Sequence, residues 1–79
     1  MKDTKMKREK NIPLYKKVWC KVRYWQGLCD ISDNELAAQL RVSPRTLHEY
    51  DKNARNVTLE KIDLFLRTNG LDISDFWSH

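Results

Sequence analysis

The 79-residue chain has 41% hydrophobic and 33% charged residues with only two Gly and two Pro, a composition typical of one small globular domain rather than a disordered chain. A domain of this size has little room for an enclosed active site, and its formal net charge of +4 is modest for a nucleic-acid-binding protein. The chain has no apolar run long enough for a transmembrane helix or a secretory signal, so we expect a cytoplasmic protein without a membrane partner.

The N-terminus is predicted to be a flexible basic arm over residues 1–11, followed by one folded domain over residues 12–79. Five basic residues against two acidic ones give this arm three of the chain's four net charges. Such an arm is either a solvated tail or, in a DNA-binding protein, a segment that lies along phosphates or in a minor groove. The charged residues of the arm are Lys2, Asp3, Lys5, Lys7, Arg8, Glu9 and Lys10.

The first ordered segment is predicted to be an amphipathic helix. It begins near Pro13, because a proline at a helix start has no intrahelical hydrogen bond to lose. Apolar residues then recur at spacings of three and four from Leu14 to Trp25. Gly27 is expected to end or weaken the helix, which leaves residues 28–31 as a connector.

A second helix is predicted to begin at Asp33, because Ser32 and Glu35 have the spacing of a capping box. It must end before Ser43, since the position before Pro44 disfavours helical backbone angles. The inner face of this helix consists of Leu36, Ala37 and Leu40.

A third helix follows a short turn, with Ser43 as its N-cap and Pro44 at its first position. On a helical wheel, Leu47 and Tyr50 point to one side. The helix is therefore predicted to be anchored on one face and exposed on the other. The exposed face carries Arg45, His48, Glu49 and Lys52.

Two further helices complete the predicted fold. Thr58 is expected to cap the first of them, which ends at Asn69 and Gly70. Apolar residues from Leu71 to Trp77 indicate a last helix of about one turn, a length that is stable only when packed. The fold class is thus all-α, a compact bundle of about five helices.

Residues 32–77 resemble the Cro and CI (lambda repressor-like, XRE) family of helix-turn-helix DNA-binding proteins. The resemblance lies in Leu36-Ala37 of the first helix and in a basic-polar loop, residues 53–57, before a helix opened by Thr58. Arg41 departs from the family pattern, which usually has Gly in the turn, so we expect either a slightly different path of the turn or a strained left-handed backbone at Arg41. The matching apolar positions are Leu40, Val42, Leu47 and Tyr50.

The resemblance implies that the third helix enters the major groove of DNA. Arg45 can make paired hydrogen bonds to guanine, or contact phosphate alone. Glu49 either accepts a hydrogen bond from cytosine or forms an ion pair with Arg45 or Lys52. His48 is either a neutral surface residue or a pH switch. The candidate base-reading residues are Ser43, Pro44, Arg45, His48 and Glu49.

Phosphate contacts are expected where basic side chains and free backbone N–H groups gather, at the end of the third helix and the start of the fourth. At the second helix, Asn34 suits phosphate better than Asp33, whose charge would repel it. The candidate phosphate-contacting residues are Asn34, Lys52, Asn53, Arg55, Asn56 and Thr58.

Neither a metal site nor an enzyme is expected. Cys20 and Cys29 lie nine residues apart without the spacing of a zinc site, and we interpret both as reduced, partly buried small hydrophobic residues. The chain has no activated nucleophile, carboxylate pair or phosphate-binding glycine loop, so we expect no catalysis, cofactor or small-molecule substrate.

The function predicted from these patterns is sequence-specific binding of double-stranded DNA by a transcriptional regulator, a repressor of a phage or mobile element. A homodimer is expected, since a two-fold dimer spans two half-sites. Phe76 and Trp77 are candidate dimer-interface residues, although closure of the core explains their pattern equally well. The alternative is a protein-interaction module or inhibitor that reuses the scaffold and binds a protein through the mixed-charge face of the third helix together with Trp19, Trp25 and Trp77.

Overall fold

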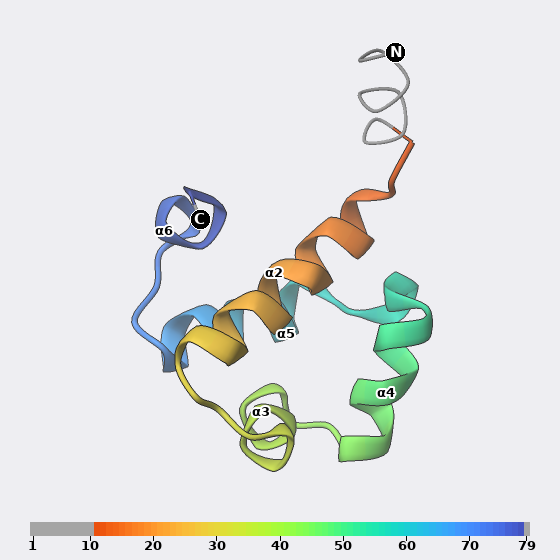
Figure 1. Cartoon of the computed structure of the whole chain (residues 1–79), viewed down its shortest axis with the longest axis horizontal. Helices are drawn as coiled ribbons and strands as arrows, with labels where there is room; N and C mark the ends of the chain where they lie inside the picture. Colours follow the sequence, from red (N-terminus) through yellow and green to blue (C-terminus); the bar gives the residue numbers. More distant parts are fainter. Residues whose placement is uncertain (1–10, 79) are drawn as a thin grey trace.

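The fold is all-helical over residues 11–78, the part of the chain that the computed structural model describes (Figure 1). The predicted bundle of about five helices is confirmed. The proposed N-terminal arm lies outside the described residues except for Asn11. None of the described helices is long and apolar enough to cross a membrane. The elements are α2 (Leu14–Leu28), α3 (Asp33–Leu40), α4 (Pro44–Lys52), the 3-10 helix η1 (Ala54–Asn56), α5 (Leu59–Thr68) and α6 (Ile73–Ser78).

One hydrophobic core joins these helices. Helix α3 packs against α4 and α5, while α2 contacts η1 and α6. The most deeply buried side chains come from five helices, so each helix contributes to one shared core rather than to separate clusters. These side chains are Val22, Leu36, Leu40, Leu47, Phe65 and Phe76.

Side-chain caps fix three helix starts where the sequence predicts them. The Ser32 hydroxyl accepts a hydrogen bond from the Glu35 N–H at 3.1 Å, and the Glu35 carboxylate accepts one from the Ser32 N–H at 2.9 Å. Ser43 caps α4 and Thr58 caps α5 in the same way through their hydroxyl oxygens. Local polar groups therefore set where α3, α4 and α5 begin.

Three helices end with a residue in the left-handed conformation. After α3, Arg41 has φ 60°, and the N–H of Val42 donates to the Ala37 carbonyl at 2.9 Å. Gly70 closes α5 with φ 66° and Asp30 follows α2 with φ 55°. Of the two alternatives for Arg41, the left-handed backbone is the one found, at a position where glycine would have no steric penalty.

Helix α2 ends at Leu28, one residue beyond Gly27, and Asp30 supplies the left-handed residue that follows it. One expectation for α2 is wrong. Cys20 and Cys29 are both exposed instead of partly buried. Cys20 lies on the outer side of α2 and Cys29 follows its last residue, so neither side chain faces the core.

The turn after α3 predicts that Arg41→Gly stabilises the protein. Glycine removes a left-handed backbone strain of about 1–2 kcal/mol from the folded state, but it also increases the conformational entropy of the unfolded chain, which offsets part of this gain. We therefore expect the free energy of unfolding to rise by about 0.5–1 kcal/mol. Urea denaturation measures the change. Arg41→Ala is the control, since it removes the side chain and keeps the strain; an equal gain in both variants would contradict this origin.

At Gly27, inside helix α2, the opposite substitution is predicted to stabilise the protein: here glycine is replaced instead of introduced. A Cβ atom built there meets no atom within 4 Å, and the backbone is helical. Gly27→Ala should therefore raise the free energy of unfolding by about 0.5–1 kcal/mol. Thermal unfolding monitored by circular dichroism checks this, and a lower melting temperature in the variant would refute it.

Candidate nucleic-acid interface

Helices α3 and α4 form a helix-turn-helix with a turn at residues 41–43. In Figure 1, α3 is seen nearly along its axis while α4 runs across the view, so the two helices cross steeply. The Lys61 ammonium donates to the Leu40 carbonyl at 3.2 Å and satisfies one free carbonyl at the end of α3. Helix α5 thus supports the turn from behind.

Helix α4 presents one face to the core and one to solvent, as the sequence predicts. Leu47 is fully buried and Tyr50 is 7% exposed, with its ring edge-to-face against Trp19 at 5.1 Å. The side chains of Arg45 and Glu49 on the opposite face are 89% and 65% exposed. His48 and Lys52 are exposed as well.

The polar side chains at the start of α4 differ in their freedom to contact another molecule. The Ser43 hydroxyl accepts from the Thr46 N–H at 3.2 Å and lies 3.0 Å from the Thr46 hydroxyl, so it is used by the cap. Arg45 and Glu49 form a long ion pair at 3.9 Å, a type worth only a few tenths of a kcal/mol when exposed. Arg45 can therefore leave this pair at little cost, while Pro44 offers an exposed apolar surface.

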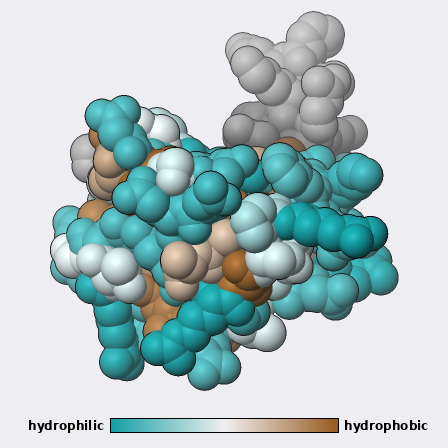
Figure 2. Space-filling model, turned by 90° about the horizontal axis from the view of Figure 1, so that it is seen from below, coloured by the Kyte–Doolittle hydropathy of each residue, from teal (hydrophilic) through white to brown (hydrophobic). Residues whose placement is uncertain are grey.

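Figure 2 shows the face of the molecule on which α3 and the start of α4 lie. Hydrophilic side chains cover most of this face, with small hydrophobic patches between them. Such a surface suits a polar, hydrated partner better than a large dry contact.

A polar network around Arg23 of α2 ties α2 to both α3 and α4, and it was not predicted. The Arg23 guanidinium donates to both carboxylate oxygens of Asp51, at 3.0 and 2.8 Å, and to Asp33 at 2.8 Å. The Trp19 indole N–H donates to Asp51 and the Gln26 amide donates to Asp33, each at 2.8 Å. We call these five residues the Arg23 network.

The Arg23 network fixes how α4 lies on the bundle, because Asp51 is in the last turns of α4 and Asp33 is the first residue of α3. One planar guanidinium therefore joins both helices of the helix-turn-helix to α2, a task that the fork geometry of arginine suits. The sequence signal that could have indicated it is the stripe Trp19, Arg23 and Gln26, which continues one face of α2 with polar residues.

Hydrogen bonding in this network shifts three pKa values. Hydrogen bonds from Gln26 and Arg23 lower the pKa of Asp33. Burial acts to raise the pKa of Asp51, but hydrogen bonds from Arg23 and Trp19 outweigh it, so this pKa is also lowered. The Asp51 hydrogen bond raises the pKa of Arg23. All three groups are therefore held in their charged forms.

His48 lies on the exposed face of α4 beside this network. Its ring nitrogens are 3.9 Å from an Asp33 oxygen and 3.8 Å from an Asp51 oxygen. This contact brings the first turn of α3, which contains the exposed Asn34, next to the middle of α4. The repulsion expected from Asp33 is reduced, because its charge is paired with Arg23.

The other candidate phosphate contacts follow one another at the end of α4, in η1 and at the start of α5. Lys52, Arg55 and Asn56 are exposed. The side-chain oxygens of Asn53 and Thr58 accept hydrogen bonds from the N–H groups of Arg55 and Lys61, so both act as caps. Asn53 and Thr58 thus shape the loop that presents its basic side chains.

Only one of the two candidate dimer-interface residues is accessible. Phe76 is 1% exposed and lies edge-to-face against Phe65 at 6.4 Å, so its assignment to an interface is wrong and it closes the core of its own chain. Trp77 is 46% exposed and stacks on Phe76 at 5.9 Å.

The alternative function relied on three tryptophans and on the mixed-charge face of α4. That face is exposed, but two of the three tryptophans are not. Trp19 is 4% exposed and belongs to the Arg23 network. Trp25 is half-buried, and its indole donates to the Phe76 carbonyl at 3.1 Å. Of the three, Trp77 alone is exposed enough to anchor a protein partner.

The part of the chain that the structure describes contains no group of three or more His, Cys, Asp or Glu that could hold a metal ion. Comparison of the chain with protein-family models, with curated proteins and with solved structures gave no match. The resemblance to the Cro and CI repressors therefore stays a prediction from the residues quoted above.

The Arg23 network predicts a loss of stability in acid. Both carboxylates have pKa values below their unfolded value of about 3.9, so they stabilise the fold above that pH, and the contribution is lost as pH falls through their folded values. Urea denaturation between about pH 6 and pH 2 should show a falling free energy of unfolding.

A variant tests the origin of this pH dependence. Asp51→Asn should lower the free energy of unfolding at neutral pH and make its decrease toward acid pH less steep. Glu60→Gln, which removes an exposed carboxylate of α5 outside the network, should keep the wild-type slope. An unchanged slope in Asp51→Asn would mean that other groups cause the acid sensitivity.

Proposed function

We propose that the chain is a sequence-specific double-stranded DNA-binding protein of the helix-turn-helix type that acts as a transcriptional repressor, with α4 as its recognition helix. The observation that supports this best is the division of α4. Leu47 and Tyr50 hold the helix on the bundle, while Arg45, His48, Glu49 and Lys52 extend from its free face.

Arg45 is the residue proposed to carry most base recognition. It lies in the first turn of α4, its side chain is almost fully exposed, and its ion pair with Glu49 is weak. Guanine offers two acceptors that match the arginine fork, and this pair of hydrogen bonds discriminates among bases. The Glu49 carboxylate can accept a hydrogen bond from the amino group of cytosine, so it favours this base. It disfavours bases that present hydrogen-bond acceptors at the same place.

Arg55 and Lys52 are proposed to contact phosphate rather than bases. Both are exposed beyond or at the end of α4, where the start of α5 also presents backbone N–H groups. Such contacts fix the position of the protein on the duplex and add affinity that salt reduces. Asn34, at the start of α3, is proposed to fix the other end of the helix-turn-helix.

The proposal includes a homodimer, because one recognition helix of nine residues covers too few base pairs for tight specific binding. Repression by occlusion of a promoter needs only such binding. The chain provides a DNA-binding domain for this purpose without requiring a cofactor or a catalytic step.

Fluorescence anisotropy with duplex DNA tests the proposal. A preferred duplex is first selected from a random pool, and binding is then compared with a scrambled duplex at several salt concentrations. The logarithm of the affinity should fall linearly with the logarithm of salt concentration. Arg45→Ala should cost about 1–3 kcal/mol on the preferred duplex and relax one base position, whereas Arg55→Ala should weaken both duplexes alike.

Arg67→Ala is the matched control, because Arg67 also forms an exposed ion pair with a carboxylate four residues away, Asp63, but lies in α5. Its affinity for both duplexes should equal that of the wild type. Affinity that is independent of salt and of DNA sequence would refute the proposed function. If Arg45→Ala lost the same affinity for the preferred and the scrambled duplex, Arg45 would be excluded from base recognition.

A further inference from the structure

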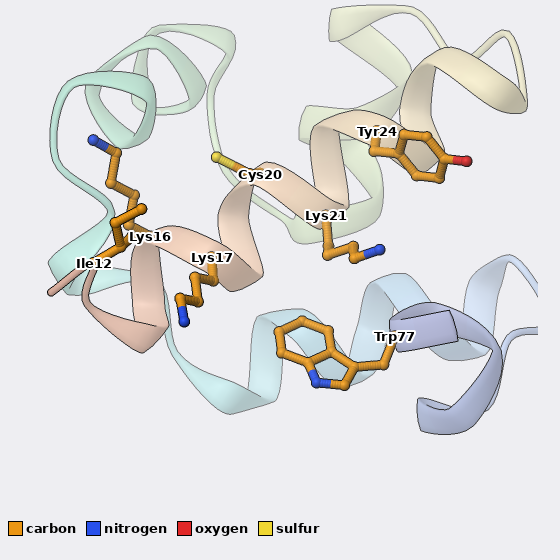
Figure 3. Close-up of a pocket in the computed structure, with 7 residues that line it drawn as sticks. All are labelled: Ile12, Lys16, Lys17, Cys20, Lys21, Tyr24 and Trp77. Carbon is orange, nitrogen blue, oxygen red and sulfur yellow. The ribbon is translucent and has the colours of Figure 1, made fainter. Parts of the chain in front are cut away.

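A groove of about 550 Å³ lies between the outer face of α2 and the last helix, α6 (Figure 3). None of its lining residues is among the candidate DNA contacts. Among the lining residues that the structure describes, three are lysines, none is acidic, and the remainder are apolar, aromatic or cysteine. We call it the lysine groove, and it is lined by Ile12, Lys16, Lys17, Cys20, Lys21, Tyr24 and Trp77.

Helix α2 supplies one wall through residues that share a face. Lys17, Lys21 and Tyr24 are spaced by four and three residues, so they line up on the side of α2 opposite its buried residues. The Lys21 ammonium lies 5.3 Å from the centre of the Tyr24 ring. This wall therefore combines lysine side chains with the aromatic ring of Tyr24.

Helix α6 supplies the other wall through Trp77. The adjacent Phe76 is fixed in the core, and the Trp25 indole holds the Phe76 carbonyl. Trp77 stacks on Phe76, which sets the direction of its own ring. Figure 3 shows the Trp77 indole extending from α6 toward α2, near Lys17 and Lys21. An exposed tryptophan held in this way is pre-organised for contact.

The apolar and cationic side chains of the lysine groove indicate what kind of molecule it binds. The half-exposed apolar surface of Trp77 and Ile12 favours an apolar side chain as the anchor of a partner, and the exposed Lys17 ammonium favours a carboxylate beside that anchor. We propose that the lysine groove docks an acidic amphipathic segment of another protein. Its apolar side chains would contact the Trp77 indole, and its carboxylates would pair with the exposed Lys17 ammonium.

Two other occupants fit the groove less well. A second copy of the chain in a two-fold contact centred on Trp77 would bring the lysines of one copy against those of the other, and like charges oppose such a contact. A nucleic-acid backbone would pair with the lysines but would leave the apolar surface of Trp77 without a partner.

The groove is separate from the proposed DNA-binding face. Lys16 and Cys20 also border a second groove that reaches Lys52 and Asn53, whereas Lys17, Lys21 and Trp77 do not. In Figure 1, α6 and α4 lie on opposite sides of α2. A segment docked between Lys17 and Trp77 therefore leaves the outer face of α4 free.

The test uses the full chain and a fluorescein-labelled helical peptide with leucines at i, i+3, i+4 and i+7 and glutamates elsewhere. The wild type should bind this peptide, and a peptide with lysines in place of the glutamates should not bind. Lys17→Glu and Trp77→Ala should each weaken binding about tenfold. In ¹H–¹⁵N spectra, the Trp77 indole signal should shift on titration of the wild type.

Arg67→Glu is the matched control, because it makes the same charge change at an exposed residue of α5 outside the groove. It should bind the peptide as the wild type does. Absence of peptide binding, an equal loss in Arg67→Glu, or an indole shift at Trp25 instead of Trp77 would overturn the proposal. A lowered dimer content in Trp77→Ala with unchanged peptide binding would assign the groove to a second copy and would overturn it as well.

The DNA measurements keep this proposal distinct from the proposed function. Lys17→Glu should bind the preferred duplex with wild-type affinity. A loss of DNA affinity in this variant would make the groove part of the DNA footprint and would overturn the docking proposal. Failure of the wild type to bind DNA, with peptide binding intact, would refute the proposed function alone.

Discussion

The hydrogen bonds of Arg23 to Asp33 and Asp51 determine how the candidate interface is presented. Apolar contacts through Leu47 and Tyr50 turn one face of α4 toward the core, but such contacts are non-directional and leave the exact rotation and position of a nine-residue helix less sharply defined. The paired hydrogen bonds from one guanidinium to Asp51 are directional. They hold the C-terminal end of α4 in one position against α2, so the placement of the outer face also depends on a residue that belongs to a different helix.

Much of the fold could be predicted because its signals are local. Ser32 with Glu35, Ser43 with Pro44, and Thr58 each act within three residues, so the sequence reveals where α3, α4 and α5 begin. The Arg23 network could not be predicted in this way. Its bonds to Asp51 join residues 28 and 32 positions apart, and only the packed fold shows that the partly exposed Asp51 carboxylate is bonded to α2.

The errors of sequence interpretation have the same origin. Cysteine is often buried, but its residue type did not indicate the side of α2 on which Cys20 lies. Phe76 and Trp77 are adjacent and both apolar, so composition treats them alike, whereas helical geometry points one into the core and the other outward. Within the candidate site, the exposed face of α4 followed from periodicity, while the capping roles of Asn53 and Ser43 limit what those side chains can contact.

The attachment of α6 makes one wall of the lysine groove depend on a folded core. A six-residue helix has no independent stability in water, so α6 is ordered only while Phe76 occupies its place beside Phe65 and Trp25 holds the Phe76 carbonyl. The Trp77 side of the lysine groove consequently exists only in chains whose core is complete. Any molecule that binds there discriminates native from partly unfolded copies and, by mass action, shifts the folding equilibrium toward the native state.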